Sequence, residues 1–433
     1  MKAFRWLGRI GPAFVIAAVV LGPGSVTVSS KLGAQHGYAL LWLPVVVGLL
    51  MAGFVTLFMR FGIASDRSFL DHCAAAWGRW FAVLAGLSMF YIATAFQFGN
   101  NIGVTTALNS MLTPAGGTAP VPAWVWPLAF NALALVFLFA FRRIYTILEK
   151  GMTLLVAVML VAFLVNLFFA KPSLGGIARG LVPTVPSGLK WQLAAGFVAT
   201  TFSIVGAIFQ TYLVRARGWG EGDYRKGVAD SLSGMAMLAV ISLVMMITSA
   251  AVLHPRGVTI ANAGDMAAQL ESLLGSAARV VFCVGFAAAA FSSFLVNAMI
   301  GGTLLSDGLG LGDDINSMPA KIGSALSLLL GMGVALLVLQ APTVSHADAL
   351  VFGQAGTLLA IPLAILATLV VLFHPRPSGV RPLGLLAKAF VVVGTVVLVA
   401  LAVRSYAGFI GKLKPKPAAA APAQAPASST PAK

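Results

Sequence analysis

Long apolar segments dominate the hydrophobic pattern of this chain, and short polar or charged stretches separate them. Eleven segments reach roughly the 20 residues that a helix needs to cross a membrane. They cover residues 11–33, 38–60, 80–111, 122–141, 145–170, 190–213, 227–253, 278–305, 322–340, 348–373 and 386–410. The pattern therefore predicts an all-α integral membrane protein with 11 transmembrane helices.

Two of the predicted helices contain residues that interrupt a helix. The first contains Gly22-Pro23-Gly24-Ser25, and the sixth contains a run of small and β-branched residues at 200–210. A broken helix at membrane depth leaves polar backbone groups that only surrounding protein or a water-lined cavity can satisfy. Because the two breaks lie five helices apart, they predict an inverted repeat of five plus five helices. Secondary transporters place their substrate site between two such breaks.

The same division predicts the domain boundaries. We expect a cytoplasmic N-terminus at 1–10, a first five-helix repeat at 11–171, a second at 190–374, and the eleventh helix at 386–410. Residues 411–433 are rich in alanine and proline and nearly free of large apolar side chains, so we expect a disordered tail there.

Composition and charge fit a multi-pass membrane protein. Hydrophobic residues make up 59% of the chain and charged residues only 9%. The net charge of +16 would suggest a nucleic-acid partner in a soluble protein, but here most lysines and arginines fall in the alternate loops that share a side with the N-terminus. We therefore expect a plasma (inner) membrane location with the N-terminus cytoplasmic and the C-terminus outside. The expected partners are the lipid bilayer and a small solute or ion, with no nucleic acid and no cofactor, and a monomer is compatible with the sequence.

Several short motifs point to one family. They are Gly11-Pro12-Ala13-Phe14, Gly33-Ala34-Gln35-His36-Gly37-Tyr38 before the second helix, Arg60-Phe61-Gly62-Ile63-Ala64 after it, and Gly180-Leu181-Val182-Pro183 before the sixth. Over residues 10–410 the chain resembles the Nramp family of proton-coupled divalent-metal transporters. The resemblance implies the LeuT-type fold and a transport function.

The resemblance also shows that the family's metal ligands are replaced in this chain. The family's Asp-Pro-Gly-Asn motif places its two ligands at Gly22 and Ser25. Its sixth-helix Met-Pro-His motif falls on residues 207–209, so that the methionine is Ala207 and the histidine is Phe209. Divalent cations usually need carboxylates or soft ligands to offset the loss of their water. The resemblance therefore implies the fold of a metal transporter without its usual site.

The family's proton-linked and auxiliary residues are replaced as well. Acidic residues of the third helix fall on Gln97 and Asn100, and a tenth-helix glutamine falls on Ala360, although Gln354 lies one to two turns earlier. We find no carboxylate or imidazole in the middle of a predicted helix. The nearest candidate is Asp230, early in the seventh helix, which we expect to cap or pair near the cytoplasmic edge.

Polar side chains nevertheless gather on the helices that should line a central cavity. On the third helix, positions 97, 101 and 105 share one face. They indicate either a path for a polar solute or ordinary hydrogen bonding between helices. The candidate substrate-binding residues are Gly22, Gly24, Ser25, Asn100, Asn101, Ser203, Ala207, Phe209, Gln210, Gln354 and Thr357.

These observations predict a secondary transporter with a non-standard site. We expect it to carry a small polar solute or ion rather than to act as a proton-coupled transition-metal carrier. One alternative is a divalent-cation transporter of the Mg²⁺ or Mn²⁺ type, as in the family. Another is a transport-inactive membrane sensor or subunit. The sequence shows no arrangement of catalytic side chains, so we do not expect an enzyme.

Overall fold

The described part of the chain is helical throughout, and it contains no strand. The computed structural model describes residues 11–113, 117–140, 142–340, 345–373 and 384–413. Its α-helices are α1 Pro12–Val20, α2 Pro23–His36, α3 Trp42–Ala64, α4 Phe69–Trp77, α5 Arg79–Leu112, α6 Val125–Ala140, α7 Arg142–Ala170, α8 Leu174–Gly180, α9 Trp191–Thr201, α10 Ile204–Ala216, α11 Tyr224–Val252, α12 Ala263–Ala267, α13 Glu271–Leu274, α14 Ala278–Gly308, α15 Met318–Leu339, α16 His346–Gly356, α17 Ile361–Phe373 and α18 Leu385–Leu413. Five single 3₁₀ turns complete it: Glu221–Asp223, His254–Arg256, Ala268–Leu270, Gly275–Ala277 and η7 Thr357–Leu359.

A helix or a helix pair occupies each of the 11 segments that the hydrophobic pattern predicts. Among the described residues, seven helices are long and apolar enough to cross a membrane, and an eighth candidate is the bent pair α16–α17. The other three segments are the broken pair α1–α2, the 16-residue α6, and α7, whose apolar part at Val156–Ala170 is short. The predicted N-terminus at 1–10 lies outside the described residues, and so does the predicted tail at 411–433 except for residues 411–413, which belong to α18.

The two expected breaks are confirmed, and the structure adds a third. The first helix stops at Val20 and restarts at Pro23, and the sixth stops at Thr201 and restarts at Ile204. The tenth segment, expected as one helix, bends by 48° between α16 and α17. Pro362 explains this bend, because it cannot donate the backbone hydrogen bond that would continue α16 into α17.

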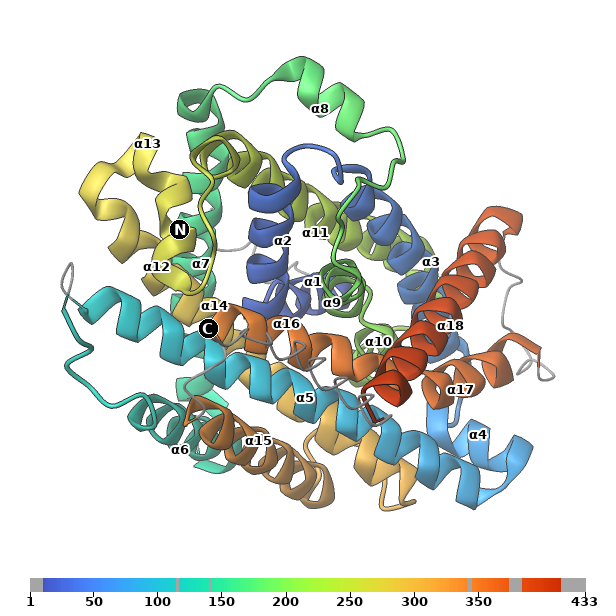
Figure 1. Cartoon of the computed structure of the whole chain (residues 1–433). Helices are drawn as coiled ribbons and strands as arrows, with labels where there is room; N and C mark the ends of the chain where they lie inside the picture. Colours follow the sequence, from blue (N-terminus) through green and yellow to red (C-terminus); the bar gives the residue numbers. More distant parts are fainter. Residues whose placement is uncertain (1–10, 114–116, 141, 341–344, 374–383, 414–433) are drawn as a thin grey trace, which may run out of the picture.

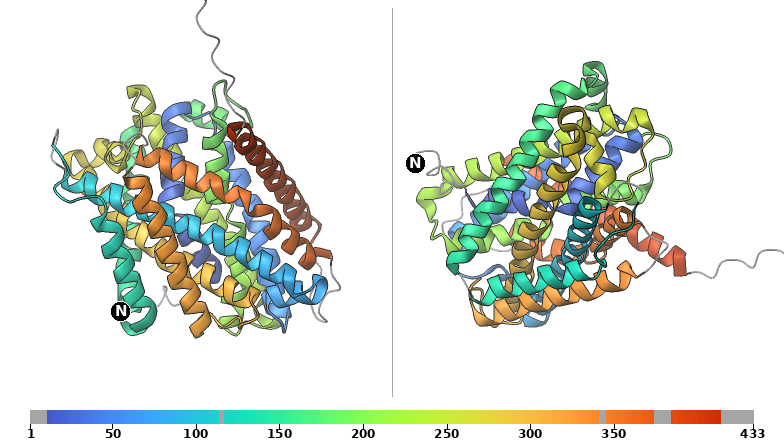
Figure 2. Two further views of the ribbon diagram at one scale, coloured as in Figure 1. Left: turned by 60° about the horizontal axis from the view of Figure 1, so that its bottom comes forward. Right: turned by 90° about the vertical axis from the view of Figure 1, so that its left-hand side faces the viewer.

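Long, unbroken helices surround the broken helices. Figure 1 shows α2 and α9 near the centre, with α3 and α11 on one side and α5 and α16 on the other. The long helices α5 and α14 pack along each other, and α15 packs on both. The two further views in Figure 2 show α18 along an edge of the molecule, where it packs on α3 and α17. The breaks are therefore shielded from lipid by other helices.

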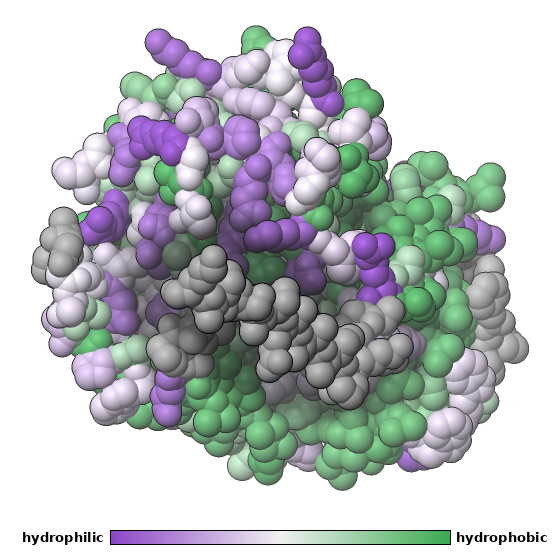
Figure 3. Space-filling view, in the orientation of Figure 1, coloured by the Kyte–Doolittle hydropathy of each residue, from purple (hydrophilic) through white to green (hydrophobic). Residues whose placement is uncertain are grey.

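The hydrophobic surface lies on the outer helices. In Figure 3 green apolar residues cover the lower part of the face, over α15, and the right-hand part, over α18, while hydrophilic residues gather in the upper half. Large apolar side chains such as Leu337 on α15 and Val396 on α18 are well exposed. Such a surface is stable only against lipid or another apolar partner. The surface therefore agrees with a membrane-embedded bundle.

Close helix packing depends on glycine at the contact between α14 and α15. A Cβ atom placed on Gly323 of α15 would come within 2.9 Å of the Cα atom of Gly302 on α14. Small residues at such positions let two membrane helices approach closely. A methyl group at this contact would push the helices apart.

We expect Gly323→Ala to destabilise the protein by about 1 to 3 kcal/mol through overpacking. The matched control is Gly333→Ala on the same helix, because a Cβ atom there meets no atom within 4 Å. Thermal unfolding in detergent should show a lower midpoint for Gly323→Ala and an unchanged or slightly higher one for Gly333→Ala. Equal midpoints for the two variants would contradict the importance of this contact.

Candidate functional site

The Ser25 side chain forms hydrogen bonds with the backbone at the break in the first helix. Leu21 and Gly22 separate α1 from α2, and Pro23 is the first residue of α2. The Ser25 hydroxyl donates to the carbonyl of Val20 at 2.6 Å and lies 3.1 Å from the carbonyl of Gly22. The Val20 carbonyl lies at the end of α1, where a helix leaves its last carbonyls without backbone partners, whereas the Gly22 carbonyl also accepts from the Val26 N–H at 3.3 Å. Ser25 therefore has a structural task at the position where the family resemblance implies a metal ligand.

Ser203 closes the second break in a similar way. It lies between α9 and α10, and its hydroxyl oxygen accepts a hydrogen bond from the Gly206 N–H at 3.2 Å. Just before the break, the Thr200 hydroxyl donates to the carbonyl of Phe197 at 3.0 Å. The hydroxyl of Thr201 is buried and has no hydrogen-bond partner. One uncommitted hydroxyl thus lies beside the second break.

Gln354 of α16 lies where the two broken helices meet α5. A Cβ atom on Gly24 of α2 would come within 3.0 Å of the Thr200 Cγ2 atom and 3.1 Å of the Gln354 Cδ atom. A Cβ atom on Gly99 of α5 would come within 2.4 Å of the Gln354 Nε2 atom. The Gln354 side chain is 2% exposed, and its Oε1 atom has no partner. Four helices thus converge on one amide with a free acceptor.

The face of α5 that meets this point consists of glycine rather than amides. A Cβ atom on Gly103 would come within 2.4 Å of the Pro23 Cβ atom, so Gly103 lies against α2, while Gly99, one turn earlier, lies against α16. Asn101 lies about 200° around the helix from Gly99. Its Oδ1 atom accepts a hydrogen bond from the Asn131 Nδ2 group of α6 at 2.7 Å. The structure therefore does not bring Asn101 to the breaks.

Gln97 and Asn100 also bind other helices or each other. The Gln97 Nε2 group donates to the carbonyl of Phe294 on α14 at 2.6 Å, and the Asn100 Nδ2 group donates to Gln97 Oε1 at 3.2 Å. Thr105 donates back to the carbonyl of Asn101 within α5. Of the two readings of this polar face, the structure shows the hydrogen-bonded one, because periodicity identifies a shared face but not what that face meets.

The remaining candidates lie further along their helices. Ala207 and Phe209 are fully buried in α10, and Phe209 stacks on Tyr212 with 6.0 Å between ring centres. Gln210 is buried beside the Asp230 carboxylate, without meeting hydrogen-bond geometry to it or to any other described group. Thr357 donates to the carbonyl of Gln354 at 2.7 Å. Of the candidate set, the structure brings together Gly22, Gly24, Ser25 and Gln354.

Carboxylates hold the helices together at the end of the bundle where α1 begins. Asp230 of α11 accepts a hydrogen bond from the Ala13 N–H at 2.8 Å, so the expected capping role is confirmed. Asp307, at the end of α14, accepts from the Ser68 hydroxyl at 2.6 Å, the Leu70 N–H at 3.1 Å and the Tyr212 hydroxyl. Burial raises the pKa of the nearby Cys73 thiol, and Asp307 raises it further. These contacts tie α1, α4 and α10 to α11 and α14.

An ion pair that the sequence reasoning missed lies toward the opposite end. Lys31 of α2 places its Nζ atom 2.6 Å from Asp348 Oδ1 of α16. The lysine side chain is 4% exposed and that of Asp348 is 55% exposed. Acidic residues and histidines gave no sign of this pair in the sequence, but Lys31 lies within the first predicted membrane helix and could have indicated it. Such residues are by default functional candidates.

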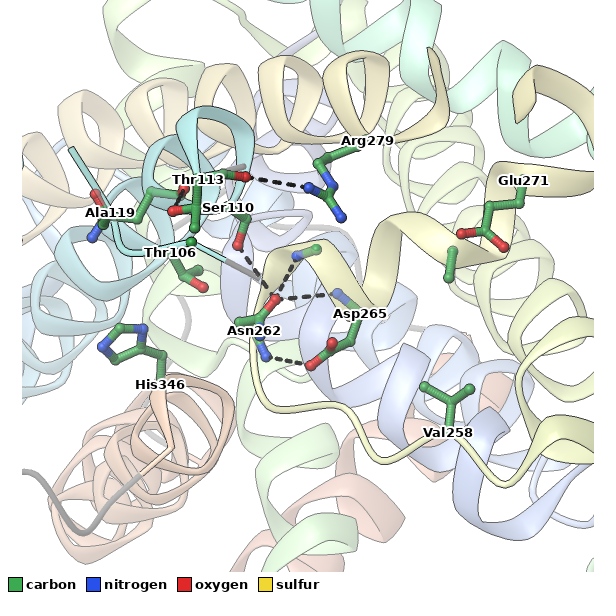
Figure 4. A pocket seen from close by; sticks show the side chains of 14 residues that line it. Thr106, Ser110, Thr113, Ala119, Val258, Asn262, Asp265, Glu271, Arg279 and His346 are labelled. Carbon is green, nitrogen blue, oxygen red and sulfur yellow. Dashed lines mark hydrogen bonds between the residues drawn. The ribbon is translucent and has the colours of Figure 1, made fainter. Parts of the chain in front are cut away.

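A cavity of about 600 Å³ opens at this same end of the bundle. Its polar lining comes from Ser110 of α5, Asn262 and Asp265 around α12, Arg279 of α14 and His346 of α16 (Figure 4). Asn262 accepts backbone hydrogen bonds from Gly264 and Asp265, and Arg279 donates to the Thr113 carbonyl at 3.3 Å. No residue of the two breaks lines the cavity. The cavity therefore lies apart from the two breaks.

The arrangement between the breaks is polar but uncharged. The described residues contain no cluster of three or more histidine, cysteine, aspartate or glutamate side chains that could hold a metal ion. The groups available near Gly24 are the Gln354 Oε1 atom, the Thr201 hydroxyl and backbone groups at the helix ends. Such groups can bind a neutral polar molecule, or an ion that keeps much of its water.

Sequence comparisons connect the chain with metal transporters. The family model "Natural resistance-associated macrophage protein-like" (Nramp) matches residues 13–407. The chain is similar to the divalent metal cation transporter MntH of Deinococcus radiodurans, with 25% identity over 91% of this chain and 88% of the relative. MntH of Yersinia pestis is 28% identical over 68% of this chain and 71% of the relative. Both relatives are named as transporters of divalent metal cations.

Structural comparisons support the fold. A manganese transporter from Eremococcus coleocola, solved with an aromatic bis-isothiourea compound, matches with a TM-score of 0.72 at 17% identity over 94% of this chain and 88% of that one. Mhp1, a nucleobase-cation-symport-1 family transporter, matches with a TM-score of 0.57 at 14% identity over 94% and 93% of the two chains. These similarities confirm the expected LeuT-type fold.

We expect Ser25→Ala to destabilise the protein by about 1 to 3 kcal/mol, because the buried Val20 carbonyl loses its side-chain donor, whereas the Gly22 carbonyl keeps the Val26 N–H. Ser29→Ala is the matched control, since Ser29 lies one turn later on α2 and its buried hydroxyl has no partner. Thermal unfolding of both variants in the same detergent measures the difference. If Ser29→Ala lowered the midpoint as much as Ser25→Ala, the hydroxyl would not be what closes the break.

Proposed function

The chain belongs to the Nramp family, and from this premise we propose that it is a secondary transporter that carries a divalent cation across the plasma membrane. Two findings support a divalent cation as the substrate. The chain is similar to relatives named as divalent metal cation transporters, and its fold matches that of a manganese transporter. With the N-terminus in the cytoplasm, the Asp230 and Asp307 contacts lie at the inner end and the Lys31–Asp348 pair at the outer end.

The chemistry between the breaks favours a hydrated hard cation. The observation that carries this proposal is the unpaired Gln354 Oε1 atom beside Gly24, where α2, α5, α9 and α16 meet. Mg²⁺ dehydrates reluctantly and usually keeps several waters, so neutral oxygens can hold it through its water shell. A sulfur ligand favours softer transition metals over Mg²⁺, and the family's methionine position is Ala207 here. We therefore propose an Mg²⁺-type substrate.

An uncharged polar solute is the second candidate, and the lack of charge at the site favours it. A doubly charged ion loses several kcal/mol of hydration when it enters a low-dielectric site, and no carboxylate beside Gly24 offsets that loss. A neutral solute needs only hydrogen bonds, which Gln354 and Thr201 can supply. A direct binding measurement separates the two candidates.

We expect Mg²⁺ binding that weakens by about 1 to 3 kcal/mol in Gln354→Ala, because an amide oxygen then no longer contacts the ion's water shell. Gly24→Leu should abolish binding, since even a Cβ atom there meets Thr200 and Gln354. Asn101→Ala serves as the control because its side chain faces α6, and it should bind as the parent does. Calorimetry with MgCl₂ and MnCl₂ measures all four proteins.

Two outcomes would contradict this proposal. Micromolar Mn²⁺ affinity that disappears in Ser25→Ala would show direct ligation at the family's usual position. Heat from neutral solutes but from no divalent cation would favour the second candidate.

We expect no proton movement along the family's usual route, because Gln97 and Asn100 are neutral and hydrogen-bonded to each other. A pH-sensitive dye inside proteoliposomes should report no acidification when Mg²⁺ uptake starts. The control is Asp230→Asn, which removes the charge of the carboxylate at the inner end. Acidification that depends on substrate and persists in Asp230→Asn would reveal another proton path.

A further inference from the structure

The Lys31–Asp348 pair joins two elements at the outer end of the proposed route. A buried ammonium group costs several kcal/mol unless a counter-ion compensates it. Lys31 is 4% exposed, and the Asp348 Oδ1 atom lies 2.6 Å from its Nζ atom. The second carboxylate oxygen of Asp348 accepts a hydrogen bond from the Ser345 hydroxyl at 2.7 Å. The lysine therefore depends on Asp348 for its charge compensation.

The pair lies directly above the candidate substrate site. Lys31 follows Gly24 by seven residues, which is two helical turns and about 10 Å on the same face of α2. On α16, which runs in the opposite direction, Gln354 contacts Gly24 and Asp348 contacts Lys31. Thr27, between them on α2, has a buried hydroxyl without a partner. The ion pair thus closes the outer end of the seam between α2 and α16.

Water reaches the two partners unequally. The Asp348 side chain is 55% exposed, so an ion from outside can approach the carboxylate without any movement of the helices. Lys31 lies behind it, and Lys190 before α9 is a second positive group that acts on Asp348. A carboxylate oxygen is the ligand that hard divalent cations prefer. In the structure, the Lys31 ammonium group contacts one of the two carboxylate oxygens of Asp348.

We propose that Asp348 is the outer recognition group for the divalent cation and that Lys31 is its built-in competitor, which sets the specificity of entry. This inference rests on the proposed transport of a divalent cation. An arriving cation takes the place of the lysine on Asp348. The released ammonium is then buried without compensation, and it regains hydration only if the seam between α2 and α16 opens. Recognition of the cation and opening of the route toward Gln354 are thereby coupled.

The experiment measures the affinity of the purified protein for Mg²⁺ by calorimetry and by the Mg²⁺-dependent rise of the unfolding midpoint. In Lys31→Met the competitor is absent and the apolar stem is kept, so we expect the affinity to rise at least tenfold. Lys31→Arg keeps the charge and should stay within threefold of the parent. Lys31→Gln repeats the test with a polar side chain in case the methionine variant folds poorly.

The double variant Lys31→Met with Asp348→Asn shows whether the gain comes from Asp348. It removes both charges at once, so no buried charge is left unpaired, and the added affinity should disappear. An unchanged affinity in both Lys31→Met and Lys31→Gln would overturn the inference. So would a gain that survives Asp348→Asn, or an equal gain in Lys31→Arg.

Gln354→Ala separates this inference from the proposed function. If Gln354→Ala weakens Mg²⁺ binding while Lys31→Met leaves it unchanged, the central site stands and the outer recognition group is wrong. If Lys31→Met gains affinity through Asp348 while Gln354→Ala has no effect, the outer site stands and the central site is wrong. Absence of Mg²⁺ binding in the parent and in Lys31→Met would overturn both.

Discussion

Backbone polar groups that lie away from water must find partners inside the protein, and this constraint shapes every interrupted helix described here. At each of three breaks, a hydroxyl side chain forms a hydrogen bond with a backbone group. Ser25 donates to the Val20 carbonyl at the end of α1, Ser203 accepts from the Gly206 N–H at the start of α10, and Thr357 donates to the Gln354 carbonyl at the end of α16. The broken helices are stable because these short side chains replace the missing backbone partners.

The hydrogen bonds of these hydroxyls also determine which polar groups between the breaks remain free to bind a substrate. Ser25 and Ser203 are committed to the backbone, so the groups left between the breaks are the Gln354 amide, one threonine hydroxyl and helix-end carbonyls. Glycine at positions 24 and 99 lets the amide approach both neighbouring helices. The carboxylates Asp230 and Asp307 lie near the start of α1, and the Lys31–Asp348 pair lies toward the opposite end. We infer that the region between the breaks is uncharged and that charged contacts hold the helices together on either side of it.

The sequence predicted the helical segments and both expected breaks, because apolar length and the Gly-Pro-Gly-Ser motif act locally. It did not predict which way the polar face of α5 turns, since Gln97 and Asn101 share a face whether that face meets a cavity or another helix. The structure shows the second case. The bend before Pro362 could have been read from the proline. Contacts between distant residues, such as Lys31 with Asp348 or Gly24 with Gln354, depend on the packing of α2 against α16 and have no local signal.

The most direct test of the central claim is a cryo-electron microscopy structure of the protein in Mg²⁺-containing buffer, compared with the same protein in a metal-free buffer. We expect an ion between Gly24, Thr201 and the Gln354 Oε1 atom, with water between metal and protein. Its distances to protein oxygens should therefore exceed the roughly 2.1 Å of direct Mg²⁺ ligation. An ion ligated directly by protein atoms elsewhere in the bundle, or no difference between the two maps near Gln354, would contradict the claim.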